Sequence, residues 1–155
     1  MNLAVRQANK GDLMAINELT DLMHHYLASL YGLKMRQDEI DEERFDEEGL
    51  DNVYVAETAD DGIIAYMSFS KESDEWTGPH YELEHIVVRE DYRGRGVGRE
   101  LFNALLERAK REEVNIKTGT LVRNRVALDF FGELGFKQLS VGLVLDLQNR
   151  ILALK

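Results

Sequence analysis

The stretch VVREDYRGRGVGRELF, residues 87–102, decides the fold, because it sets three glycines between a β-branched run and an apolar helical pattern. Glycines at such a junction let the backbone turn tightly and aim several N–H groups at one point. The N-terminus of the following helix adds partial positive charge. The pattern is typical of a phosphate-binding loop. Its glycines and arginines are Arg93, Gly94, Arg95, Gly96, Gly98 and Arg99.

Two well-known phosphate loops do not fit this spacing. A P-loop requires Gly-Lys-Ser/Thr at its end, but no lysine or hydroxyl residue follows Gly98. A dinucleotide-binding fingerprint requires a third glycine or alanine three positions after the second, where this chain has Arg99. Both readings are therefore disfavoured.

The spacing Arg-x-x-Gly-x-Gly, filled by Arg93, Gly96 and Gly98 after a β-strand pattern, resembles the GNAT superfamily of N-acetyltransferases. A second segment, NRVALDFFGELGF at 124–136, resembles the later signature of that family. The resemblance implies one domain over residues 1–155 with an α/β fold. Its central sheet would be mixed, mostly antiparallel and flanked by helices.

Hydrophobic periodicity and turn residues predict an alternation of helices and strands that agrees with this fold. Asp12 is positioned to cap the first helix with its side chain. The last β region could be one strand or a hairpin through Gly142. We expect a strand first, and then helices at 13–29, at 38–48, from the glycine stretch to about residue 112 and at 124–134, with further strands at 52–58, 62–70, 81–90, 116–122 and 136–147.

The resemblance also assigns residues that hold acetyl-coenzyme A as co-substrate. Backbone amides along the loop would bind its pyrophosphate, with side-chain contacts from Arg93 and Arg95. Backbone groups of the preceding strand would pair with the pantetheine arm like a short extra strand. Asn124 would contact the same arm, and it is also suited to cap a helix. The backbone contacts would come from Ile86, Val87 and Val88 in the strand and from Gly94, Arg95, Gly96, Val97, Gly98 and Arg99 in the loop.

Acetyl transfer requires a base, because an alkylamine is mostly protonated at neutral pH. Family members with a similar strand carry the base where this chain has Glu84, and partial burial there would raise the pKa of a carboxyl group. Glu82 and His85 stay open as alternatives, because a β-bulge would reverse which side chains face the site. By the same resemblance, a backbone amide near Val88 would polarise the thioester carbonyl.

The second signature departs from the family at one position. Many members have a tyrosine facing the cofactor, able to protonate the leaving thiolate, where this chain has Phe131. Phenylalanine cannot donate a proton, so the usual general acid is missing. Water or another tyrosine, such as Tyr26, Tyr31 or Tyr81, could substitute, but none has a specific sequence signal. A thiolate is a tolerable leaving group without a general acid. The alternative function is therefore a coenzyme A binding module without catalysis.

The charge and cysteine content of the chain limit the classes of partner and ligand that we expect. The net charge is −10, and residues 38–48 hold eight acids against one base, which disfavours nucleic acid. This segment either solvates the surface or attracts a cationic small-molecule amine. The chain has no cysteine, and the adjacent His24 and His25 do not share a helix face, so we expect no metal. No apolar run is long enough for a membrane span, which predicts a cytoplasmic protein. A homodimer is expected from the resemblance alone.

Overall fold

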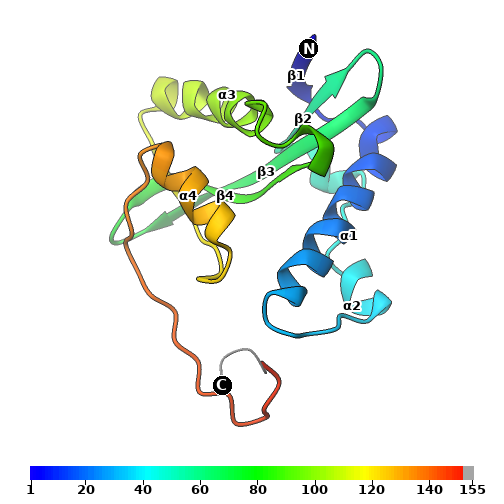
Figure 1. The fold of residues 1–155 in the computed structure, drawn as a ribbon. Coiled ribbons are helices and arrows are strands. Elements are labelled where there is room, and N and C mark those ends of the chain that lie inside the picture. The colour runs from blue at the N-terminus through cyan, green and yellow to red at the C-terminus, as the bar shows by residue number, and fades with distance from the viewer. Residues whose placement is uncertain (152–155) are drawn as a thin grey trace.

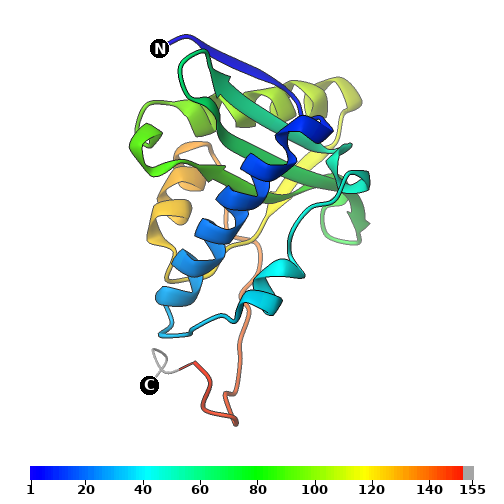
Figure 2. The same ribbon diagram turned by 90° about the vertical axis from the view of Figure 1, so that its right-hand side faces the viewer.

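The computed structural model describes residues 1–151, and within them a five-stranded sheet lies between helices on its two faces (Figures 1 and 2). The strands follow chain order across the sheet; neighbours from β1 to β4 are antiparallel, and β5 runs parallel to β4. The expected mixed, mostly antiparallel sheet flanked by helices is thus confirmed. The strands are β1 (Leu3–Gln7), β2 (Val53–Thr58), β3 (Gly62–Asp74), β4 (Gly78–Val88) and β5 (Asn115–Thr118). The helices are α1 (Leu13–Ser29), α2 (Gln37–Asp41), α3 (Val97–Glu112) and α4 (Arg125–Glu133).

Two apolar cores hold the helices to the sheet. On one face, Ile16 and Leu19 of α1 pack in a buried cluster with Tyr66 of β3. On the other face, Leu101 and Leu105 of α3 pack in the larger cluster, which also takes in side chains of α4. Because successive side chains of a strand point to opposite faces, the central strands contribute to both cores.

Strand β4 carries a bulge that shapes the rest of the molecule. Its register with β3 pairs Leu83 with Phe69 and His85 with Ser68, so Glu84 is the extra residue. Beyond the bulge, β4 continues beside β3 but no longer beside β5, which pairs only with residues 80–83. Residues 84–88 therefore have one strand edge that no described strand covers.

The acidic helix expected over 38–48 is much shorter. Helix α2 ends at Asp41, and the chain then continues through turns. Carboxylates three and four residues apart repel one another along a helix. In addition, the side chain of Asn17 in α1 exchanges hydrogen bonds with the backbone N–H and C=O of Phe45, at 2.8 and 3.0 Å, and fixes that residue against α1.

The expected cap of α1 is also wrong in its chemistry. Asp12 precedes the helix, but its side chain makes no cap hydrogen bond. It accepts instead from the Arg6 guanidinium at 2.7 and 2.9 Å and from the backbone N–H of Asn9 at 2.9 Å. A full ion pair with Arg6 is the stronger interaction for a buried carboxylate.

Two strand predictions need correction. Strand β5 stops at Thr118 instead of extending to residue 122, because Gly119 follows and the Thr118 hydroxyl donates to the carbonyl of Leu83 at 2.9 Å. No strand forms over 136–147: every residue from Lys137 to Leu145 is exposed and pairs with no strand within residues 1–151. The alternation of apolar residues in this segment is local, but a strand also needs a partner edge.

Candidate functional site

The glycine loop links the bulged strand to α3. Gly94 and Gly96 have φ values of +72° and +84°, in the left-handed region that favours glycine. Within residues 1–151, the amides of 94–99 have no hydrogen-bond acceptor; the first that does is Glu100, which donates to the Gly96 carbonyl at 3.0 Å. A run of free amides at the start of a 16-residue helix is a site for an anion. These residues fit the pyrophosphate of a nucleotide cofactor.

Positive charge surrounds this loop. Arg93, Arg95 and Arg99 are exposed, and none forms an ion pair with a described carboxylate. Arg93 donates its Nε to the carbonyl of Val88 at 3.0 Å, which ties the loop to the end of β4. The Arg95 guanidinium lies 5.2 Å from the centre of the Tyr92 ring. A chain of net charge −10 thus presents a local cationic surface at its free amides.

The loop, β4 and α4 meet at Gly98. A Cβ atom at this residue would lie 3.3 Å from the Phe130 ring and 3.7 Å from a methyl group of Val88. Gly98 therefore allows the loop, β4 and α4 to pack closely, whereas Gly96 allows the left-handed backbone of the loop. The two parts of the sequence that carry the family resemblance, 93–98 and 124–136, are in contact.

The free edge of β4 lies directly before this loop. Ile86, Val87 and Val88 pair with β3 on one side only. An extended backbone with one open edge can accept an extended ligand by strand-like hydrogen bonding. Asn124 begins α4 and its Oδ1 accepts from the Ala127 N–H at 3.3 Å, so its expected role as a helix cap is confirmed.

The three candidate bases differ in their surroundings. Glu84 is the bulge residue and is exposed, so the partial burial expected of it is not found. Glu82 lies on the other side of the bulge, with its carboxylate 3.4 Å from Nε2 of His80. His85 is half-buried below α1. The bulge separates the exposed carboxylate from the sheltered imidazole.

His85 belongs to a chain of hydrogen bonds. Its Nδ1 lies 3.2 Å from the Tyr66 hydroxyl, which lies 2.7 Å from the Thr20 hydroxyl, and Thr20 donates to the carbonyl of Ile16 at 2.9 Å. Each hydroxyl has one proton. For all three bonds to form, Tyr66 donates to Thr20 and accepts from Nδ1–H of His85. This tautomer leaves the lone pair of His85 on Nε2.

The electrostatics keep His85 neutral. Burial lowers its pKa below the usual value of 6.5, and the neighbouring His24 lowers it further, while the carboxylates of Glu84 and Glu43 oppose the shift. The ring of His24 lies edge-on, with centroids 6.0 Å apart. A neutral imidazole at pH 7 is able to accept a proton. Glu43 belongs to the acidic segment 38–48, so the charge of this segment acts on His85.

Phe131 lies in the apolar core, where its ring contacts those of Phe130 and Phe136. Two of the tyrosines considered as substitute acids already have partners: the Tyr31 hydroxyl accepts from the Arg123 N–H at 3.2 Å, and the Tyr81 hydroxyl donates to a carboxylate of α3. The hydrogen bonds that link Thr20, Tyr66 and His85 could not be found from the sequence. Thr20 and Tyr66 are 46 residues apart, and Tyr66 and His85 are 19 residues apart.

No helix within residues 1–151 is both long and apolar enough to cross a membrane. Across the same residues, no three histidine or carboxylate side chains lie close enough together to hold a metal ion.

Comparison with known proteins gives a family match, a curated relative and several solved structures. The model of the acetyltransferase (GNAT) family matches residues 17–136. An uncharacterized N-acetyltransferase of Methanocaldococcus jannaschii is 40% identical over 63 residues, which are 39% of this chain and 27% of that relative. The chain thus matches only about a quarter of the length of this curated relative.

Solved structures agree with the fold. A tetramutant of the BH1408 protein from Bacillus halodurans superposes with a TM-score of 0.76 at 20% identity, covering 92% of this chain and 98% of that one. The PaiA N-acetyltransferase from Thermoplasma acidophilum, solved with coenzyme A, gives 0.73 at 17% identity, covering 92% and 94%. The aminoglycoside N-acetyltransferase AAC(6')-Iy, solved with a bisubstrate analogue, gives 0.70 at 22% identity, covering 94% and 97%.

Proposed function

Because this chain belongs to the GNAT acetyltransferase family, we propose that it is an N-acetyltransferase that moves an acetyl group from acetyl-coenzyme A to a primary amine of a small molecule. The observation that carries the proposal is the run of free amides over 94–99 beside an open strand edge over 84–88. The first part suits a pyrophosphate and the second suits an extended amide-containing arm.

In this proposal, the protein holds the cofactor mainly through its backbone. The amides of 94–99 bind the pyrophosphate, with charge from the side chains of Arg93 and Arg95. The open edge at Ile86, Val87 and Val88 binds the pantetheine arm, with help from Asn124. Acetyl-coenzyme A would supply an activated acetyl thioester. The amide of Val88 is the proposed donor to its carbonyl oxygen.

Of the three candidate bases, His85 is the best supported. Its Nε2 carries the lone pair, and burial keeps the ring neutral at pH 7. We assign Glu84 the neighbouring role of attracting the ammonium group of the acceptor before it loses a proton. An exposed carboxylate next to the base is suited to this. The carboxylate of Glu43 also raises the pKa of His85 through its negative charge. Negative charge beside the proposed base supports a cationic acceptor.

Several solved neighbours suggest where to start with acceptors. The structural likeness to an aminoglycoside N-acetyltransferase agrees with a small amine as the acceptor class. A panel of spermidine, aminoglycosides, amino acids and lysine peptides covers small amines and a peptide comparison.

The experiment is release of free thiol from acetyl-coenzyme A with each amine, read beside the rise in melting temperature that the cofactor causes. Turnover with a small amine establishes the proposed function, whereas turnover with lysine peptides alone contradicts the acceptor class. If the cofactor raises the melting temperature and no amine releases thiol, either the panel lacks the acceptor or the chain binds without transfer, as the missing hydroxyl at Phe131 allows, and an untargeted metabolite screen separates the two.

A further inference from the structure

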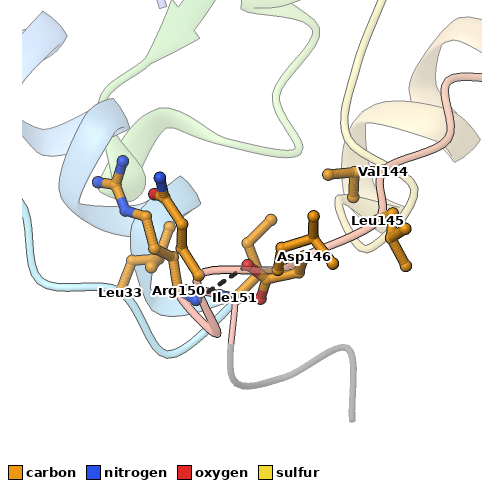
Figure 3. A pocket seen from close by; sticks show the side chains of 8 residues that line it. Leu33, Val144, Leu145, Asp146, Arg150 and Ile151 are labelled. Atoms are coloured by element: carbon orange, nitrogen blue, oxygen red, sulfur yellow. Dashed lines mark hydrogen bonds between the residues drawn. The ribbon is translucent and has the colours of Figure 1, made fainter.

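Helix α1 borders two different parts of the molecule. Just beyond its C-terminal end, Leu33 borders a hollow whose other lining residues lie between 144 and 151 (Figure 3). The one carboxylate that lines this hollow, Asp146, accepts from the backbone N–H groups of Arg150 and Ile151 at 3.0 and 2.8 Å. The side chains that contact the surroundings of His85 come from the middle of the helix instead.

The middle of α1 carries a polar stripe, defined here as Asn17, Thr20, Asp21 and His24. Spacing of three, four and seven residues places these side chains on one face of the helix. None of the four is exposed, although this spacing is usually apolar where a helix covers a sheet. Polar side chains at such positions require partners.

Two members of the polar stripe hold the acidic segment 38–48 against α1. The side-chain amide of Asn17 exchanges hydrogen bonds with the backbone N–H and C=O of Phe45, at 2.8 and 3.0 Å. The Asp21 carboxylate accepts two bonds from the Arg44 guanidinium, at 2.5 and 3.1 Å. The backbone of the segment at residues 44 and 45 is therefore fixed by one turn of helix.

The other two members act on His85 from α1 itself. The Thr20 hydroxyl lies 2.7 Å from that of Tyr66, which lies 3.2 Å from Nδ1 of His85. The ring of His24 stands edge-on to that of His85, with centroids 6.0 Å apart. All four members of the stripe thus contact His85, its hydrogen-bond partner or the segment beside it.

The ring of Phe45 lies where the acidic segment meets His85. Its centroid is 6.1 Å from that of His85 and 5.7 Å from that of Tyr66, with interplanar angles of 87° and 79°. Edge-to-face contacts at these distances are favourable. Phe45 also packs against the core on the α1 side of the sheet. An apolar ring in this place keeps water from part of the imidazole.

We propose that Phe45 is a positioning residue for His85: α1 holds it through Asn17 and Asp21, and its ring excludes water from one side of the imidazole. The part that Phe45 plays in catalysis rests on the proposed function, whereas the shielding of His85 does not. A ring that only packed would stabilise the fold without changing the protonation of His85.

The groups that act on His85 come from every element packed around it. They are His24 from α1, Glu43 from the acidic segment, Glu84 from β4 and the Tyr66 hydroxyl from β3. Burial is the largest influence and lowers the pKa of His85, while the two carboxylates oppose it. Loss of the shielding ring would therefore leave the carboxylates with the greater effect.

Proton NMR of the histidine rings measures this shielding without any turnover. The resonance of His85 is the one that disappears in His85→Gln. In Phe45→Ala we expect His85 to titrate at a higher pH than in the wild type, closer to the ordinary value of 6.5, because water reaches the ring. Phe45→Leu restores an apolar side chain and should return most of this change.

The matched control is Phe136→Ala. Phe136 is also half-buried but packs on the other face of the sheet, so its loss should cost stability and leave the titration of His85 unchanged. An unchanged titration in Phe45→Ala, or an equal change in Phe136→Ala, overturns the proposal.

The link through Asn17 has its own test. Asn17→Ala should also raise the pH at which His85 titrates, whereas Glu18→Ala, at the exposed neighbouring residue, should not. If Asn17 acts through Phe45, adding Asn17→Ala to Phe45→Ala has no further effect. Two effects that simply add contradict the link.

Hydrogen exchange on the wild type requires no variant to fold. We expect the Phe45 amide, which donates to Asn17, to exchange at least tenfold more slowly than in an unstructured peptide. An unprotected amide at Phe45 overturns the proposal.

Turnover then separates the positioning role from the shielding. If an amine is acetylated, the fall of kcat in acid should move to higher pH in Phe45→Ala together with the NMR titration. A fall that stays in place while the titration moves overturns the positioning role. A titration that moves although no amine is acetylated supports the shielding and counts against the proposed function alone.

Discussion

The two halves of β4 both lie beside β3, but only the first half also has a strand on its other side within residues 1–151. Residues 80–83 pair with both β3 and β5, while residues 85–88 pair with β3 alone. The first half is fully satisfied by the fold and holds the buried Leu83. The second half has an open edge, begins with the bulged Glu84 and leads into the free amides of the glycine loop. We therefore propose that this strand serves stability in its first half and ligand binding in its second.

The boundary between the halves depends on two local features. The Thr118 hydroxyl takes the carbonyl of Leu83 where β5 ends, and the bulge at Glu84 reverses the facing of the side chains that follow. If this division is real, changes on the two sides of the boundary will separate binding from stability.

The largest effect is expected at Gly96 in the glycine loop. Gly96→Asp adds a Cβ atom to a residue with left-handed backbone and sets a carboxylate among the proposed phosphate-binding amides. We expect the affinity for coenzyme A, measured by calorimetry, to fall roughly a thousandfold, which corresponds to about 4 kcal/mol.

The control for this change is Gly62→Asp in the β2–β3 turn. Gly62 has φ +66° and open space around its Cα, as Gly96 does, but lies outside the loop. Gly62→Asp should lower the free energy of unfolding about as much as Gly96→Asp does, and it should change the affinity for coenzyme A less than threefold. Equal losses of affinity in both variants would remove the loop from the binding site.

A buried residue in the doubly paired half should affect stability alone. Leu83 is 1% exposed, so Leu83→Ala is expected to lower the free energy of unfolding by about 3 kcal/mol, as the loss of a core side chain leaves a cavity. Urea denaturation checks the cost, and calorimetry should find coenzyme A affinity changed less than threefold. A large loss of affinity without loss of stability would erase the distinction between the halves.

In the open half, removal of the proposed base should slow turnover. His85→Gln keeps a donor for Tyr66 but loses the basic nitrogen, and we expect a rate loss of about a hundredfold at pH 7. Because the pKa of His85 is lowered, the wild-type rate should fall with acid only below pH 6.5, and this limb should vanish in the variant.

The comparison variant is Glu84→Gln. If Glu84 attracts the ammonium group of the acceptor, its loss should raise KM and leave kcat within about threefold. A kcat that falls in Glu84→Gln and survives in His85→Gln would exchange the two assignments.

The smallest effect concerns the pH dependence of stability. Burial lowers the pKa of His85 in the folded protein, so the unfolded chain binds the proton more strongly. This contribution is fully present above pH 6.5 and is lost as the pH falls toward the folded pKa. The difference in unfolding free energy between the wild type and His85→Gln should change by at most about 1.4 kcal/mol per pH unit. A difference that stays constant from pH 7 to 5 would contradict the buried, neutral imidazole.

The parts of this molecule that could be predicted from the sequence are those set by short-range rules. The loop was predictable because the glycine spacing and the flanking patterns lie within one segment, and Asn124 was predictable as a helix cap. The open edge at 86–88 was implied by the family resemblance alone, since no local pattern shows where β5 stops. The hydrogen bonds from Thr20 to His85 join three distant elements. The segment 136–147 shows the same limit: its alternation of apolar residues is local, but a strand also needs a partner edge, and no strand within residues 1–151 pairs with it.

The most direct test of the division of β4 is hydrogen exchange of the backbone amides with and without coenzyme A. The account predicts that the cofactor slows exchange over 94–99 and on the open edge at 86–88, while residues 80–83 exchange at an unchanged, slow rate. If protection appears uniformly along β4, or nowhere in the loop, the second half of this strand and the loop are not the cofactor site.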